Sequence, residues 1–123
     1  MESILISINP QHVENIFNGT KRYEYRKIKG KRKINKMLIY STYPIKKVVG
    51  EAQIEEVLEG SPEEIWEKTK QYSGVEEIFY NEYFKGKTKA IAYKLKNVKK
   101  YNTPKELSTY GVKSAPQSFV YVD

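Results

Sequence analysis

The sequence contains a glycine followed by a short alternating run of charged and aromatic residues, Gly19-Thr20-Lys21-Arg22-Tyr23-Glu24-Tyr25-Arg26. Gly19 is placed to end a preceding helix, and the alternation that follows is typical of a β-strand. Tyr23 and Tyr25 would share one face of that strand, while Arg22, Glu24 and Arg26 would share the other. The three charged side chains can form an exposed ion-pair ladder, worth about 0–1 kcal/mol per pair, or they can line a site. At this point both interpretations remain open.

The residues before this stretch predict a strand followed by a short helix. Ile4, Ile6 and Ile8 alternate with other residues, which is the period of a strand with one face toward a core. Asn9 is a good N-cap and Pro10 suits the first helical position. A helix of about two turns is therefore expected before Gly19.

The residues after it predict a mostly β arrangement with a helical insertion. We expect strands over 21–27, 37–43, 48–58, 89–101 and 118–122, and a helical turn within 103–107. Ser61-Pro62-Glu63-Glu64 has the pattern of a capping box that opens a helix to about residue 70, and Ser73-Gly74-Val75-Glu76 suggests a second. Gly50 is a candidate bulge that would curl the sheet.

These elements predict one α+β domain over residues 1–123. Its five to six strands would form a curved or closed sheet, with a short helix after the first strand and a helical insertion after the fourth. The chain has no cysteine, which excludes disulfides, a thiolate nucleophile and cysteine zinc sites. The apolar run from Ile4 to Ile8 is too short for a signal peptide or a membrane span, so we expect a cytoplasmic protein without membrane association.

Charge is distributed unevenly along a chain whose net charge is +7. The segment 51–82 contains ten glutamates and two lysines, whereas 21–36 contains nine cations and one glutamate, and 85–105 contains eight lysines and no acid. Such segregation can produce a basic face, which is typical of proteins that bind polyanions. A genome of low GC content also encodes lysine freely, so the bulk charge alone does not decide the partner.

The pattern Gly19-x-Lys21-x-x-Glu24-x-Arg26, after a proline-initiated helix, resembles the signature of ASCH domains in the PUA-like superfamily. The resemblance continues through Ile39 to Thr42, Val49 to Glu51, Ser61 to Glu64 and Ala115 to Tyr121, and so covers nearly the whole chain. It implies a PUA-like β-barrel with a cleft beside the signature strand. It also implies binding of RNA, with single strands favoured, or of a modified nucleoside.

The same resemblance leaves activity open, because some ASCH relatives are hydrolases. In those that deacetylate acetylcytidine, a threonine stands where this chain has Glu24 and works with a lysine that matches Lys21, while a later glutamate matches Glu55 best. The missing hydroxyl argues against that amidohydrolase mechanism. A metal-independent ribonuclease is the other enzymatic alternative, in which Lys21 polarises a phosphate and Glu24 is the base. A third alternative is a protein-interaction module of a transcription or translation regulatory complex, with the acidic helices as its contact face.

The residues themselves suit nucleic-acid chemistry. A partly buried Lys21 can stabilise an oxyanion, Glu24 can accept a hydrogen bond from an exocyclic amine, and Arg26 presents a planar fork to phosphate or a purine edge. We predict no metal site and no cofactor, interpret His12 as a surface residue of a first helical turn, and expect a monomer. The predicted catalytic residues are Lys21, Glu24 and Glu55; the predicted nucleic-acid contacts are Lys21, Arg22, Glu24, Arg26, Lys27, Ser41, Thr42, Tyr43 and Lys46.

Overall fold

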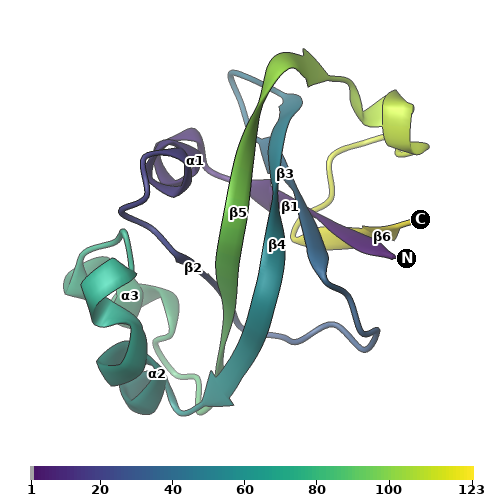
Figure 1. Ribbon diagram of the computed structural model, residues 1–123. Coiled ribbons are helices and arrows are strands. Elements are labelled where there is room, and N and C mark those ends of the chain that lie inside the picture. Colours follow the sequence, from purple (N-terminus) through teal and green to yellow (C-terminus); the bar gives the residue numbers. More distant parts are fainter. Residues whose placement is uncertain (1) are drawn as a thin grey trace.

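The computed structural model describes residues 2–123 and contains one six-stranded sheet. In spatial order the strands are β2, β5, β4, β3, β1 and β6, and the sheet curls into a half-barrel (Figure 1). Among the strand pairs of residues 2–123, only β1–β3 is parallel. The bounds are β1 Ser3–Ile8, β2 Tyr23–Arg26, β3 Lys36–Ser41, β4 Lys47–Gly60, β5 Ala90–Lys105 and β6 Phe119–Val122.

Three α-helices and two short 3₁₀ turns complete the fold. Helix α1 (Pro10–Phe17) follows β1, while α2 (Pro62–Thr69), η1 (Lys70–Tyr72) and α3 (Glu77–Tyr83) form the insertion between β4 and β5. Figure 1 shows all three helices on one side of the sheet and η2 (Leu107–Tyr110) on the other. None of the helices between residues 2 and 123 has the length and apolar character needed to cross a bilayer.

The predicted capping signals explain where two of the helices begin. The Asn9 side chain accepts a hydrogen bond from the backbone of Gln11, and Pro10 is the first helical residue of α1. At α2, Ser61 and Glu64 exchange side-chain to backbone hydrogen bonds of 3.2 Å, so that capping box is confirmed. The second predicted box is wrong: α3 starts one turn later, after Glu76, with no side-chain cap.

The sheet bends where β4 contains Gly50. The register with β5 shifts between Val48 and Gly50, as predicted for a bulge. A Cβ at Gly50 would lie 2.5 Å from the backbone oxygen of Lys99 and 2.7 Å from the Phe17 ring. Glycine is therefore required for this strand to pass beneath α1.

Three apolar clusters form the core. The largest contains Ile4, Ile6 and Ile8 of β1 beneath α1. A second is built around Tyr25, Tyr80 and Phe84, where β2 meets the helical insertion. The third lies on the opposite face of the sheet around Leu5 and Leu38, where η2 packs.

Several element boundaries differ from the sequence prediction. Strand β2 starts at Tyr23 rather than Lys21, because Lys21 forms only an isolated bridge with Ser73. The predicted helical turn at 103–107 is wrong, since β5 continues through Lys105 and the 3₁₀ turn follows it. Strands β2 and β6 are the two outer strands of the sheet order, so the structure shows a half-barrel where a closed barrel was one of the expectations.

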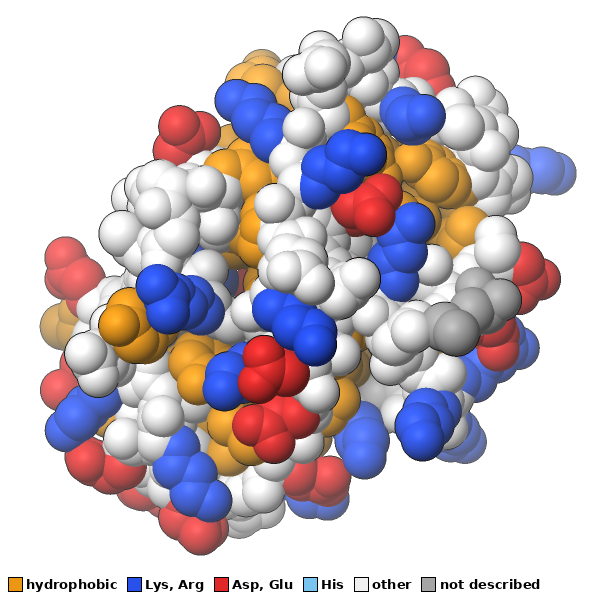
Figure 2. All heavy atoms as spheres, in the orientation of Figure 1, with side chains coloured by type: hydrophobic (Ala, Val, Ile, Leu, Met, Phe, Trp, Pro, Cys, Tyr) orange, Lys and Arg blue, Asp and Glu red, His pale blue; other side chains and the backbone are white. Residues whose placement is uncertain are grey.

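Acidic and basic side chains are mixed along β4 and its neighbours. Glutamates of β4 pair with lysines of neighbouring elements, as in Glu55 with Lys94 at 3.2 Å and Glu59 with Lys89 at 2.5 Å. Figure 2 accordingly shows Asp and Glu side chains interspersed with Lys and Arg over β4 and β5. This face therefore carries no uniformly basic surface.

Candidate functional site

A small pocket lies where the end of β1, helix α1, strand β2 and helix α3 meet. Its volume is about 130 Å³, and we call it the Lys21 pocket. Lys21, Glu24 and Arg26 all line it, so the structure brings together the three polar residues of the signature.

Lys21 is held in place by its backbone and by its ammonium. Its N–H donates to the Asn15 carbonyl at 2.9 Å, and Nζ donates to the Ser73 carbonyl at 3.0 Å. The residue is only 2 % exposed, and Nζ also lies 4.8 Å from the centre of the Tyr25 ring. Burial lowers the pKa of Lys21 from its ordinary value, an effect that Glu24 opposes and Arg26 reinforces.

Glu24 lies between the two cations. Its Oε2 accepts from Nη2 of Arg26 at 2.6 Å and from Nε at 3.1 Å, while Oε1 lies 3.8 Å from the Lys21 ammonium. The side chains of Glu24 and Arg26 are only 8 % and 13 % exposed. The two residues therefore form a buried ion pair, unlike the exposed ladder that was the alternative interpretation.

Arg26 uses most of its donors within the protein. Besides Glu24, it donates through Nη2 to the Ser7 carbonyl at 2.8 Å and through Nη1 to Ser118 Oγ at 3.3 Å. It thereby links the edge strand β2 to β1 and to the segment before β6. Within the pocket it holds Oε2 of Glu24, while Oε1 of Glu24 accepts no hydrogen bond from Arg26.

His12 was expected at the surface, and that expectation is wrong. It lines the Lys21 pocket from α1, is half-buried, and packs its ring against Phe79 with 5.2 Å between centroids. Its Nδ1 is buried without a hydrogen-bond partner among residues 2–123. Burial, followed by the charge of Lys21, lowers the pKa of His12; Glu24 opposes this shift, and Arg26 adds a smaller lowering. The net shift favours the neutral imidazole.

Aromatic side chains of α3 form the outer wall of the pocket. Phe79 is 49 % exposed, and its ring is nearly parallel to that of Tyr83, with 10° between planes. Exposed Lys27 places its Nζ 4.4 Å from the centre of the Tyr83 ring, at the rim. Flat apolar surface and a cation at the edge are features that bind planar, charged ligands.

The other predicted contacts lie outside the pocket. Arg22 is exposed and stacks on Tyr72 at 4.0 Å. Glu55 is exposed on β4, where it pairs with Lys94, and the structure does not bring it to Lys21.

The turn after β3 is adjacent to the pocket through one backbone contact. The Thr42 N–H donates to the carbonyl of Ile8, a pocket residue, at 3.0 Å. Ser41 is buried, whereas Tyr43 is 79 % exposed and Lys46 is also exposed. Among residues 2–123, no group of three or more His, Cys, Asp or Glu side chains is arranged to hold a metal ion.

Comparisons with known proteins agree with this description. A model of a domain of unknown function, DUF365, matches residues 2–115. The chain belongs to the DUF365 family. The crystal structure of an ASCH protein from Zymomonas mobilis superimposes with a TM-score of 0.89 at 26% identity, covering 98% of this chain and 87% of that one. These matches support the ASCH family for this DUF365 chain.

Curated relatives of this DUF365 chain carry several different names. One is a large ribosomal subunit protein uL22 of Ureaplasma parvum, 36% identical over 122 residues, and the chain spans 39% of its length. Another is an ASCH domain-containing ribonuclease of Zymomonas mobilis, 31% identical over 94 residues, which are 76% of this chain and 64% of that protein. Two of the relatives and neighbours that match, this ribonuclease and the Zymomonas mobilis crystal structure, carry the ASCH name.

Proposed function

We propose that this domain binds single-stranded RNA, or a modified nucleoside, in the Lys21 pocket. The observation that carries the proposal is the almost complete burial of Lys21 beside Glu24 in a pocket with an aromatic wall. Burying charges is expensive and contributes little net stability, so such a group in a pocket is a candidate for ligand binding. The ribonuclease of Zymomonas mobilis among the relatives supports a nucleic-acid ligand.

The geometry favours one flat ring over a duplex. A volume of about 130 Å³ excludes a double helix, and the rings of Phe79 and Tyr83 offer a surface for stacking. The Lys21 ammonium donates and Oε1 of Glu24 accepts, which matches the mixed donor and acceptor edge of a nucleobase. Lys27 at the rim would contact the adjoining phosphate.

The test compares the wild-type protein with Lys21→Met, which removes the ammonium and retains most of the side-chain volume. Anisotropy titrations would use labelled single-stranded RNA and duplex RNA, and calorimetry would use acetylated cytidine. We expect the wild type to bind single strands or the nucleoside, and the variant to lose at least tenfold in affinity with its fold intact by circular dichroism. Unchanged affinity in Lys21→Met, or no binding by the wild type, would refute the proposal.

A metal-independent ribonuclease is the second candidate, and the position of His12 favours it. A neutral imidazole in the pocket can accept the proton of a 2′-hydroxyl as its oxygen attacks phosphorus, while Lys21 stabilises the charge on the phosphoryl oxygens. The bond from phosphorus to the 5′-oxygen then breaks, and that oxygen takes up a proton. His12 suits the role of base better than Glu24, whose Oε2 is occupied by Arg26.

This candidate predicts cleavage of single-stranded RNA in the presence of a chelator, with a 2′,3′-cyclic phosphate product. The matched DNA strand lacks the attacking hydroxyl and must stay intact. His12→Asn should reduce the rate by about 100-fold or more while leaving RNA affinity within a few-fold of the wild type. If the protein binds single-stranded RNA but does not cleave it, the ribonuclease candidate is refuted and the binding proposal stands.

A further inference from the structure

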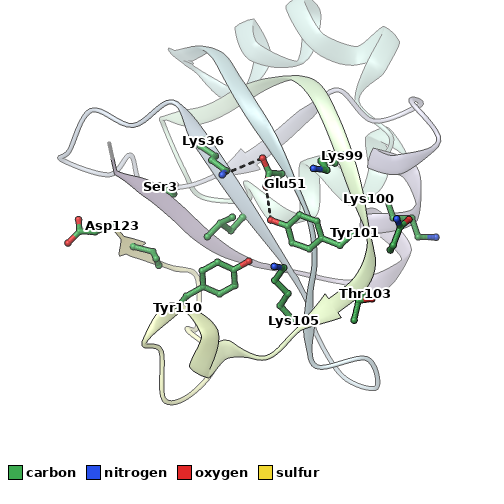
Figure 3. Close-up of a pocket in the computed structure, with 13 residues that line it drawn as sticks. Ser3, Lys36, Glu51, Lys99, Lys100, Tyr101, Thr103, Lys105, Tyr110 and Asp123 are labelled. Carbon is green, nitrogen blue, oxygen red and sulfur yellow. Dashed lines mark hydrogen bonds and ion pairs between the residues drawn. The ribbon is translucent and has the colours of Figure 1, made fainter.

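We propose a second RNA contact, a phosphate-binding cavity on the face of the sheet opposite to α1. This cavity has a volume of about 550 Å³, and we call it the Lys105 cavity (Figure 3). Its lining includes Lys36, Glu51, Lys99, Tyr101, Lys105 and Tyr110. The proposal rests on the proposed function, because it names a second region of the same ligand.

The Lys105 cavity is separate from the Lys21 pocket. It lies at the start of β1 and β3, where Leu38 faces Glu51 across the β3–β4 pair, and the two sites share no lining residue. Leu38 belongs to the apolar cluster beneath η2, whereas Ile4 and Ile6 point to the α1 side. A ligand that occupies both sites must therefore be long.

Charge in this cavity is arranged around one carboxylate. Glu51 pairs with Lys36 at 3.4 Å and accepts a hydrogen bond from the Tyr101 hydroxyl at 2.8 Å (Figure 3). Burial tends to raise the pKa of Glu51, but the Tyr101 hydrogen bond and the charges of Lys36 and Lys99 outweigh it and hold that pKa below its ordinary value. Glu51 is thus an anion that fixes Lys36 and Tyr101.

Two further lysines of the cavity form no close ion pair. Neither Lys99 nor Lys105 forms an ion pair with a carboxylate among residues 2–123, and Lys105 Nζ lies 5.6 Å from the centre of the Tyr101 ring. Asp123 also borders the cavity, but Figure 3 shows its carboxylate pointing away from the lysines. The cavity therefore carries an excess of positive charge that an external anion can neutralise.

The open shape and the lysines together select phosphates of a flexible strand. Lysine ammonium groups act as point charges without the fixed fork of arginine, so they favour phosphate without reading sequence. The ring of Tyr110 faces the cavity opposite Tyr101, and both offer surfaces on which a base can stack (Figure 3). Single-stranded RNA that extends beyond the Lys21 pocket is the ligand that fits these features.

The experiment measures RNA affinity against salt for the wild type and for Lys99→Ala/Lys105→Ala. A control, Lys31→Ala/Lys33→Ala, removes the same charge from two exposed lysines that do not line the cavity. Single-stranded RNA of about 6 nucleotides is short enough for one site, and a strand of about 24 nucleotides is long enough to extend beyond it. Inorganic phosphate at constant ionic strength is a competing ligand.

We expect the cavity variant to bind the long strand several-fold more weakly and to bind the short strand as the wild type does. Its plot of log affinity against log salt for the long strand should be shallower by about 1.4, since each phosphate contact on a single strand contributes about 0.7. Equal slopes in wild type and cavity variant, or an equal change in the control, would overturn the proposal. Inorganic phosphate should weaken binding of the long strand to the wild type and have little effect on the cavity variant, because the lysines bind phosphate groups. Equal competition in the two proteins would overturn the proposal.

These outcomes separate the two proposals. If Lys21→Met weakens binding of both strands while the cavity variant does not, the second contact is refuted and the proposed function stands. If the wild type binds neither strand at any salt concentration, the second contact is refuted. The proposed function is then refuted as well if acetylated cytidine also fails to bind. If the cavity variant has the same thermal unfolding temperature as the wild type, its weaker binding does not result from a loss of folding.

Discussion

The Lys21 pocket and the Lys105 cavity contain the same kinds of charge in opposite environments. In the pocket, Lys21, Glu24 and Arg26 are buried and fixed by hydrogen bonds, whereas in the cavity Glu51 has 28 % of its side chain exposed and two lysines form no close ion pair. Buried charges interact strongly and are costly to separate, while exposed charges are screened by water and salt. The pocket is therefore suited to hold one group precisely, and the cavity to attract a polyanion.

The largest expected difference comes from removing the central carboxylate of each site. Glu24→Gln leaves Lys21 and Arg26 buried without their counter-charge and should lower the free energy of unfolding by about 3–5 kcal/mol. Glu51→Gln disrupts partly exposed contacts and should cost about 1 kcal/mol or less. Urea denaturation of the two variants measures both values. Equal losses would show that burial does not distinguish the two sites.

The second comparison is between two glycines with positive φ, one that packs against Lys21 in the folded chain and one that does not. Gly74 has a φ of +68°, and a Cβ there would lie 2.2 Å from the Cβ of Lys21. Gly86 has a similar φ of +76°, but a Cβ would meet nothing within 4 Å. Both alanine variants should lose about 1–2 kcal/mol for the left-handed backbone, and Gly74→Ala should lose more because of the clash. Chemical denaturation measures the losses, and Gly86→Ala serves as the control for backbone strain.

Acidification should lower the free energy of unfolding through protonation of His12. Its pKa is lowered in the folded state, so the unfolded chain takes up a proton first as the pH falls below the ordinary value of 6.5. The stability present above pH 6.5 should therefore decline between 6.5 and the lower folded pKa, then level off. In His12→Asn this decline should be reduced, as measured by urea unfolding at several pH values. An identical pH dependence in the variant would show that His12 is not the group responsible.

The smallest expected effect is the change in unfolding free energy of the cavity variant. Lys99→Ala/Lys105→Ala removes exposed charges that form no close ion pair, so its unfolding free energy should stay within about 0.5 kcal/mol of the wild type. Differential scanning calorimetry measures this value. A large loss would mean that these lysines stabilise the fold and would weaken the contrast with the pocket.

Local signals in the sequence predicted much of this fold. Asn9-Pro10 and the Ser61 box fixed two helix starts because caps act through the residues next to them. Gly50 predicted the bend for the same reason. The errors in element boundaries arose where contacts with distant residues determine the end of a strand. Lys21 lies outside β2 because it bridges Ser73, 52 residues away. Strand β5 continues past Tyr101 because β4 pairs with it there.

The candidate site was predicted in part. The signature spacing indicated Lys21, Glu24 and Arg26, but the sequence contained no measure of their burial. His12 and Phe79 were missed because they come from helices 67 residues apart that meet only in the folded chain. The position of His12 in the first turn after the Asn9 cap, on a helix that leads into the signature strand, was the signal available for it.

Mapping the RNA contact on the protein tests directly whether the Lys21 pocket is the binding site. A titration of ¹⁵N-labelled protein with single-stranded RNA of about 6 nucleotides, followed by amide chemical shifts, locates the contact residue by residue. We expect the largest shifts at His12, Lys21, Glu24 and Phe79, with small shifts at Lys99 and Lys105. Shifts confined to regions away from the Lys21 pocket would contradict it.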